Sequence, residues 1–237
     1  MTPLHVAIEA RQTTCVRLLL EAGADRMVRD RLGRTAMDAA LPPPANMSDP
    51  QAMQQWRSIV LLLWNTGRQK PEAPAGPMPW SLEYTVMHRQ ADVTNMLLGL
   101  SVDPNAVGTR GTTPLADAAL KGDVQTVRAL LAHGARVNVI SQAGTQPIHD
   151  AALGDSAEVI RELAAYGANI NARTRDEGQT PLHVAAAMGK MKAVEALVAL
   201  GADLTIRDSQ GRTPVEVAIR AGLTDIAAFL RRAAAGK

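Results

Sequence analysis

The most constraining feature of this chain is a pair of short motifs that return together every 33 or 34 residues. The first is a Thr-Pro-Leu-like string and the second is a Gly-Ala pair. The prolines of the first are Pro114, Pro147, Pro181 and Pro214, and the glycines of the second are Gly134, Gly167 and Gly201. The same template begins again at Thr2-Pro3-Leu4-His5 and continues at Gly23. Self-similarity at this period predicts an array of stacked units in which no unit buries its own apolar surface alone.

The residues of one unit predict two helices. Thr180 is suited to an N-cap and Pro181 to the first helical position, where no backbone N–H is needed. A small apolar face follows, and Gly189 lets the chain leave that helix. A second apolar stripe over 194–198 predicts the second helix, which ends near Gly201. An extended turn then leads to Thr213.

These motifs resemble the ankyrin repeat family, whose unit of about 33 residues carries a T-P-L-H-x-A signature. The resemblance covers nearly the whole chain. It implies an all-α fold, an ankyrin-repeat solenoid of about seven stacked helix-turn-helix units with short hairpin-like turns. We expect little sheet and contacts only between neighbouring units.

The register predicts a single ankyrin-repeat domain over 1–237, in which the middle departs from the pattern. An insertion near 42–52 separates the two helices of the second unit and is expected to lengthen its second helix. Residues 68–79 form a Pro-rich irregular loop, and 233–237 are a tail. The predicted units are 1–33, 34–67, 80–111, 112–144, 145–178, 179–211 and 212–232.

Composition removes several classes of function. A formal charge of +2 is far from the basic excess expected of a domain that holds duplex DNA by charge. Cys15 is the single cysteine, which excludes intramolecular disulfides and cysteine-rich metal sites and favours a reducing compartment. The longest apolar run is six residues, too short to span a membrane. We therefore expect an intracellular, cytoplasmic protein without membrane insertion, and nuclear or host-delivered alternatives stay open.

The recurring histidines are the tempting catalytic or metal-binding residues. His5, His149 and His183 lie one or more repeats apart, but no other histidine, cysteine or paired carboxylate converges on them at ligand spacing. In the family that the chain resembles, this histidine links neighbouring turns. No phosphate-binding loop or nucleophile motif is present. The sequence predicts no enzyme, no cofactor, no metal and no small-molecule substrate.

Two further residue types are interpreted as structural. Cys15 lies among apolar residues of a helix and is expected to be a small core residue. Asn138 and Asn171 follow the Gly-Ala pairs and are expected to hydrogen-bond within their own turns.

The resemblance implies a scaffold that binds a partner protein through turn tips and the concave inner-helix face. Ten basic residues stand at those positions against five acidic ones, and nine of the ten are arginines, which pair carboxylates bidentately. An acidic segment of a protein is therefore the predicted partner, in preference to nucleic acid. The ten are Arg29, Arg31, Arg34, Arg110, Lys121, Arg173, Arg175, Arg207, Arg212 and Arg220.

The irregular middle offers one more candidate binding residue. Four of the six aromatic residues crowd there: Trp56, Trp64, Trp80 and Tyr84. They are interpreted either as packing elements of a distorted junction or as a partner surface. Trp80 is the candidate for exposure in a binding site, and Trp64 is expected to be buried.

A second function stays open from the sequence. The first unit starts at its first helix, without a polar capping repeat of the kind that stacked architectures need. The alternative is a regulatory or targeting/effector ankyrin module of a longer protein whose N-terminal part is missing.

Overall fold

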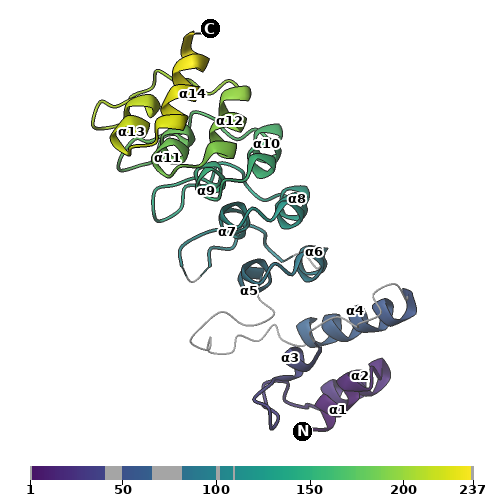
Figure 1. Cartoon of the computed structure of the whole chain (residues 1–237). Helices are drawn as coiled ribbons and strands as arrows, with labels where there is room; N and C mark the ends of the chain where they lie inside the picture. The colour runs from purple at the N-terminus through teal and green to yellow at the C-terminus, as the bar shows by residue number, and fades with distance from the viewer. Residues whose placement is uncertain (1, 41–49, 66–81, 100–101, 109, 236–237) are drawn as a thin grey trace. The chain divides into compact units, whose positions relative to one another are not determined.

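The computed structural model consists of helices joined by extended loops, and none of its described residues lies in a strand (Figure 1). It describes residues 2–40, 50–65, 82–99, 102–108 and 110–235. The chain divides into two compact units, Met1–Tyr84 and Thr85–Lys237. We call them the N-terminal and C-terminal units and describe each by itself.

The N-terminal unit contains two helix pairs. In the first pair α1 packs on α2, and in the second α3 packs on α4. Contacts of α1 with α3 and of α2 with α4 join the pairs. The helices are α1 (Pro3–Glu9), α2 (Thr13–Glu21), α3 (Ala36–Ala40) and α4 (Pro50–Asn65).

The predicted lengthening of the second helix of this unit is confirmed. Helix α4 has 16 residues, whereas α2 has nine. Trp56 of α4 is buried, and its indole N–H donates to the carbonyl of Ala40 at 2.8 Å. This aromatic residue is therefore a packing element. Residues 41–49, the loop 68–79, Trp80 and the side chain of Trp64 lie outside the described residues.

The C-terminal unit repeats one helix pair. Helix α5 (Leu82–Met87) runs across the boundary between the units. The other helices are α6 (Ala91–Gly99), α7 (Pro114–Leu120), α8 (Val124–Ala132), α9 (Pro147–Leu153), α10 (Ala157–Ala165), α11 (Pro181–Ala187), α12 (Met191–Ala199), α13 (Pro214–Arg220) and α14 (Thr224–Ala235).

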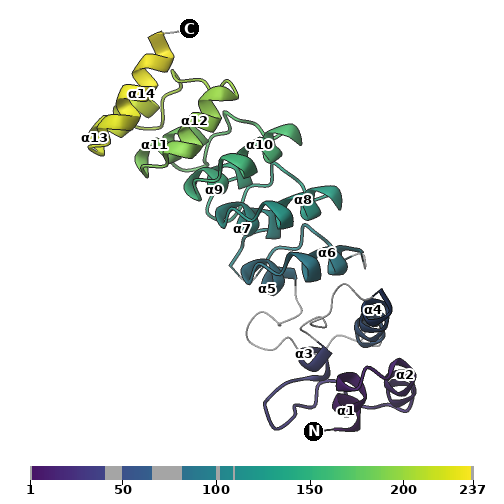
Figure 2. The same ribbon diagram turned by 45° about the vertical axis from the view of Figure 1, so that its right-hand side comes forward.

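These helices form two parallel rows within the C-terminal unit (Figure 2). The inner row is α7, α9, α11 and α13, and the outer row includes α8, α10 and α12. From α7 to α14, each helix contacts its partner in the pair and a helix of an adjacent pair. The prediction that contacts join neighbouring repeats is confirmed.

Capping explains where the inner helices begin. Thr113, Thr180 and Thr213 are the N-caps of α7, α11 and α13, and each hydroxyl accepts a backbone N–H of the first turn. A proline fills the first position of each helix. At the other end of the repeat, Gly201 has φ +85°, a conformation that favours glycine, so the chain leaves α12 there.

The core is aliphatic and lies between the rows. Ile148, Leu182 and Leu197 are fully buried, and the inner helices contribute alanines such as Ala151 and Ala185 with no exposed surface. Small residues allow neighbouring helices to approach closely, which accounts for the small number of aromatic residues.

The expectation that Cys15 is a core residue is wrong. Cys15 is exposed on α2, on a face that no described residue covers. With Val6, Leu18 and Leu19 it lines an open apolar groove of about 550 Å³. The sequence position is a core position, but burial also requires a neighbouring helix pair on that side.

Candidate functional site

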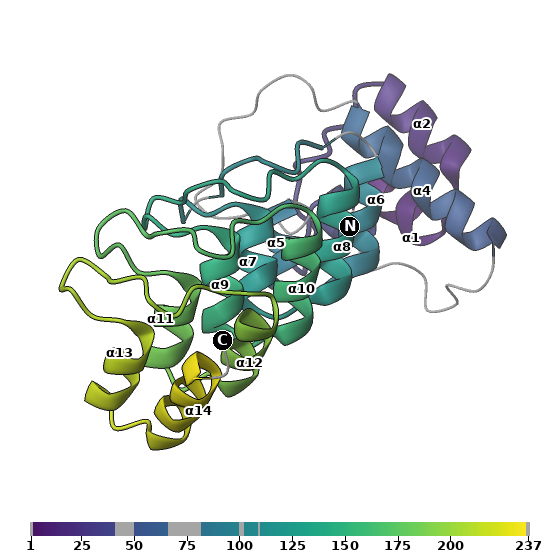
Figure 3. The ribbon, with the colours of Figure 1, turned by 90° about the horizontal axis from the view of Figure 1, so that it is seen from above.

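Loops that we call fingers connect each outer helix to the next inner helix, and they project from the same side of the C-terminal unit (Figure 3). A backbone hydrogen bond closes the tip of a finger: the N–H of the first residue of the tip donates to the carbonyl of its last residue. Among the described residues, the closing pairs are Asp30–Arg34 in the N-terminal unit, and Gly108–Thr112, Ser141–Thr145, Thr174–Gln179 and Asp208–Arg212 in the C-terminal unit.

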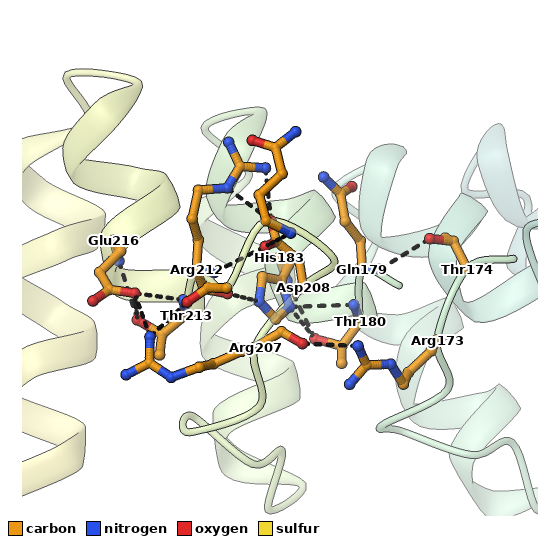
Figure 4. Close-up of polar contacts among 12 residues, drawn as sticks. Arg173, Thr174, Gln179, Thr180, His183, Arg207, Asp208, Arg212, Thr213 and Glu216 are labelled. Atoms are coloured by element: carbon orange, nitrogen blue, oxygen red, sulfur yellow. Dashed lines mark hydrogen bonds and ion pairs between the residues drawn. The ribbon is translucent and has the colours of Figure 1, made fainter. Parts of the chain in front are cut away.

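The histidines join one repeat to the next, as predicted. Nε2 of His183 lies 2.9 Å from the carbonyl of Arg212, and its Nδ1 lies 2.8 Å from Oγ1 of Thr180 (Figure 4). His5 makes the same pair of contacts with Arg34 and Thr2. A carbonyl only accepts, so Nε2 carries the proton and Nδ1 is the acceptor.

His149 follows this pattern with two carbonyls. Its Nε2 lies 3.1 Å from Ala172 O and 3.2 Å from Gln179 O. Burial lowers the pKa of His149 and of His183, and their hydrogen bonds to carbonyls oppose that shift only in part. Neutral, fully hydrogen-bonded imidazoles have no ring nitrogen left for a metal or a substrate.

The asparagines link neighbouring repeats, which corrects the expectation of local hydrogen bonds. Nδ2 of Asn138 donates to Gly167 O at 3.1 Å, and its Oδ1 accepts from the N–H of Asn169 at 3.2 Å. Asn105 repeats this geometry one unit earlier, and Oδ1 of Asn171 accepts from Asp203 N at 2.9 Å. An amide carries both a donor and an acceptor, so one side chain can bridge two turns.

Two of the predicted binding arginines form an ion pair within their own finger. Arg212 pairs with Asp208 at 2.6 Å and Arg34 pairs with Asp30 at 2.7 Å, and both guanidinium groups are half-buried. Burial raises the pKa of each aspartate, but hydrogen bonds from the arginine and the backbone outweigh it. The pKa of Asp30 falls to about 2, and that of Asp208 is also lowered.

Five more of the predicted residues make contacts within the chain. Arg110 pairs with Asp117 at 2.7 Å, and the half-buried Lys121 donates to Met87 O at 2.6 Å. Arg29, Arg173 and Arg207 are exposed, and each donates to a carbonyl of a finger: Gly33 O, Arg207 O and Gly211 O respectively. Arg207 also lies 3.2 Å from Glu216 (Figure 4).

Three of the predicted residues are uncommitted. Arg31, Arg175 and Arg220 are exposed, and within the described part of the chain their side chains make no hydrogen bond or ion pair. Figure 4 and the hydrogen bonds bring Arg173, Arg207 and Arg212 together on adjacent fingers of the C-terminal unit. Arg29, Arg31 and Arg34 belong to the N-terminal unit. Trp80 lies outside the described residues.

The structure also brings acidic groups to the fingers that the sequence count omitted. Asp25, Asp103 and Asp203 are exposed at the finger bases, and each accepts from the backbone N–H two residues ahead. The excess of positive charge at the fingers is therefore smaller than the sequence count suggested. The Gly-Ala-Asp pattern was the signal that could have revealed Asp25 and Asp203, whereas Asp103 follows Ser101-Val102 and lacks that pattern.

Two carboxylates on the inner helices are a feature that sequence reasoning missed. Asp117 of α7 and Asp150 of α9 both lie four residues after the N-cap. Asp117 is paired with Arg110, whereas the hydrogen bond of Asp150 comes from Thr145 at 3.4 Å. Burial raises the pKa of Asp150 to about 7, and the charge of Asp117 adds to the shift. Their common position, four residues after the N-cap, was the sequence signal that could have revealed the two carboxylates.

Within the described residues, no group of three or more His, Cys, Asp or Glu side chains is arranged to hold a metal ion. No helix in the described part of the chain is both long and apolar enough to cross a membrane.

Stacked helix pairs, polar fingers and side chains that bridge adjacent repeats define a helical repeat protein. The chain belongs to the ankyrin repeat family: models of ankyrin repeats match residues 82–174 and 171–236, in a form with three copies, and residues 1–40, in a form with many copies. Ankyrin repeats are generally protein–protein interaction modules and typically lack enzymatic activity.

Several curated proteins are similar to this chain. Protein PhlB of Serratia liquefaciens is 39% identical over 139 residues, which are 59% of this chain and 47% of that protein. The B-cell lymphoma 3 protein homolog of Mus musculus is 29% identical over 226 residues, 95% of this chain and 41% of that protein. Rabankyrin-5 of Mus musculus is 51% identical over 43 residues, 18% of this chain and 4% of that protein. The chain thus matches less than half the length of each.

Proposed function

We propose that this chain is a non-enzymatic scaffold that binds a partner protein through its fingers and the exposed side of its inner helices. The observation that carries the proposal is that the arginines of the fingers fall into two structural groups. Some hold the fingers in place, as Arg212 does, and others such as Arg175 project from them uncommitted. A rigid finger that presents a charged side chain is a preorganised contact for another molecule.

An acidic segment of a partner protein suits the fingers of the C-terminal unit. Arg173 and Arg207 are exposed and each uses only part of its guanidinium for the chain's own carbonyls. Arginine has five N–H donors, so donors remain to bind a carboxylate bidentately. Asp176 and Glu177 are exposed on the same finger, so the partner's acidic residues must reach the arginines individually and cannot rely on a uniformly positive surface.

The test uses a fluorescein-labelled glutamate-rich peptide and fluorescence anisotropy. The variant Arg173→Ser with Arg175→Ser removes two finger charges. The matched control, Arg161→Ser with Arg231→Ser, removes two exposed arginines of the outer helices α10 and α14 and changes the net charge equally. We expect the finger variant to raise Kd about fivefold or more, the control to leave it unchanged, and binding to weaken as salt rises past about 0.15 M.

Equal weakening in both variants would mean that only net charge matters and would overturn the finger site. Retained binding in the finger variant would do the same. Arg212 is left intact in this design because its loss would disturb the finger itself through Asp208.

The uncovered face of α1 and α2 favours a second candidate, in which the chain is a regulatory or targeting module of a longer protein. Cys15 and Leu19 line the apolar groove there, and their counterparts Ala193 and Leu197 in the C-terminal unit are completely buried. A further helix pair would cover the groove. The experiment is to fuse the α11–α12 repeat ahead of Thr2 and measure thiol labelling of Cys15, which should become protected.

A further inference from the structure

An apolar row crosses the inner helices of the C-terminal unit. Leu120 of α7, Leu153 of α9 and Met188 at the end of α11 are 40%, 36% and 59% exposed. Leu120 and Leu153 occupy the same place in successive repeats, and Met188 lies one residue further along. Scattered exposed apolar residues need no explanation, but a row on adjoining helices marks an interaction surface.

The helices that carry the three residues are neighbours in space. Helices α7, α9 and α11 lie side by side in Figures 2 and 3, and α9 contacts both of the others. At Gly154, directly after Leu153, an added Cβ would lie 2.3 Å from the carbonyl oxygen of Leu120. The ends of α7 and α9 therefore abut, and no side chain at Gly154 separates the two leucines.

The spacing of the row selects the kind of segment that fits it. Packed helices lie about 8 to 10 Å apart, so the row repeats at about that distance. Seven residues of an α-helix advance about 10.5 Å and return to nearly the same face. Three residues of a strand advance a similar distance but point to the opposite face. A helix with one apolar residue per heptad matches the row, and an extended segment does not.

The charges beside the row indicate a second feature of the incoming helix. Asp117 and Asp150 precede Leu120 and Leu153 by three residues, which places each pair on one face of its helix. Arg110 pairs with Asp117, whereas no described cation pairs with the half-buried Asp150. A lysine or arginine beside the apolar stripe of the incoming helix would supply that counter-charge.

From this juxtaposition we propose that the row Leu120–Leu153–Met188 binds an amphipathic helix of a partner protein, with heptad-spaced apolar residues and a basic residue directed at Asp150. The proposal rests on the proposed scaffold function and assigns it a second contact, distinct from the arginine fingers. It makes the partner bipartite, with an acidic segment at the fingers and a basic amphipathic helix on the inner helices.

The probe is a labelled synthetic helix of about three heptads, with leucine at one position of each heptad and lysine flanking it. A scrambled peptide of the same composition, with leucines five residues apart, is the matched control. Binding to the full chain is measured by anisotropy, and methyl signals of Met188 locate the contact. The protein variant is Leu153→Ser with Met188→Ser, and its control is Ile140→Ser, which removes a 48% exposed apolar residue of a finger.

We expect the heptad peptide to bind, the scrambled peptide to bind at least about tenfold more weakly, and the row variant to lose about tenfold in affinity while Ile140→Ser loses none. Asp150→Asn should weaken binding to a smaller extent. Circular dichroism melts of all variants check that the fold is retained.

Several results would overturn the proposal: no binding of the heptad peptide, equal binding of both peptides, or no effect of the row variant. Self-association of the chain that the row variant abolishes would also overturn it, because the row would then cover a second copy. The Glu-rich peptide assay tests the fingers separately. If only the Glu-rich peptide fails to bind as expected, the finger site is wrong and the row proposal stands. If only the heptad peptide fails, the row proposal is wrong and the finger site stands.

Discussion

The first repeat and the last repeats of this chain carry the same motifs but differ in what they bury. Cys15, thirteen residues after Thr2, is exposed, whereas the residue at the same offset is buried in the last four repeats. Those residues are Thr126, Val159, Ala193 and Ile226. The side chain type does not explain the difference, because Thr126 is more polar than cysteine. A core position becomes a core only when a neighbouring helix pair covers it.

Truncating a leucine in the two regions gives the largest expected contrast. Leu197 is fully buried, and Leu19 at the equivalent position is half-buried. Leu197→Ala should cost about 2 to 5 kcal/mol of unfolding free energy because it leaves a cavity. Leu19→Ala should cost about 1 kcal/mol, since water already reaches that side chain. Urea unfolding followed by circular dichroism checks both, and equal losses would contradict the difference in covering.

The second contrast is between two aspartates of the inner helices. Asp117 forms an ion pair with Arg110, whereas burial raises the pKa of Asp150 to about 7. The folded state holds the proton of Asp150 more tightly than the unfolded state does. Its contribution to stability is therefore complete below pH about 4 and lost as pH rises toward 7. Asp150→Asn should flatten this loss and raise stability at pH 7 by about 2 to 4 kcal/mol.

The measurement is the difference in unfolding free energy between the parent and Asp150→Asn across that pH range. Taking the difference cancels the opposite contribution of His149 and His183. Their lowered pKa values destabilise the fold as pH falls below about 6.5 in both proteins. A difference that does not change with pH would show that Asp150 ionises normally.

The third contrast concerns the bridge between repeats. The position of His183 is occupied by Ala116 in α7 and by Glu216 in α13, so these two inner helices lack the imidazole link. His183→Ala should cost about 1 to 3 kcal/mol, because it removes the two hydrogen bonds of the buried imidazole, one with the carbonyl of Arg212 and one with the hydroxyl of Thr180. Amide hydrogen exchange should quicken around Thr213. Unchanged exchange there would mean that the bridge does not hold the next finger.

The smallest contrast is between two arginines of the fingers. Arg212→Ser should cost about 1 kcal/mol, since it removes the partner of the buried carboxylate of Asp208. Arg175→Ser should change stability by less than about 0.5 kcal/mol because its side chain is exposed and uncommitted. Thermal melts of the two variants compare them directly. A destabilising Arg175→Ser would remove that residue from the proposed binding surface.

The repeat, the helix pairs and the caps follow from the sequence because they depend on local chemistry. Thr180-Pro181 specifies a helix start by itself, and the prediction of its N-cap is confirmed. The structural role of His183 also follows, since its partners lie at fixed offsets in the repeat. The prediction of a long α4 is also confirmed, because the insertion and the proline of the first turn can be identified in the sequence.

The tertiary structure alone decided which of these residues are available to a partner. Arg212 and Arg175 are the same residue type on neighbouring fingers, yet one is held by Asp208 and the other projects. The exposure of Cys15, the bridging role of Asn138 and the raised pKa of Asp150 likewise depend on the adjacent repeat. The sequence period determines which side chains each repeat carries. Contact between adjacent repeats determines which of them stay exposed, because a side chain is buried only when a neighbouring repeat covers it.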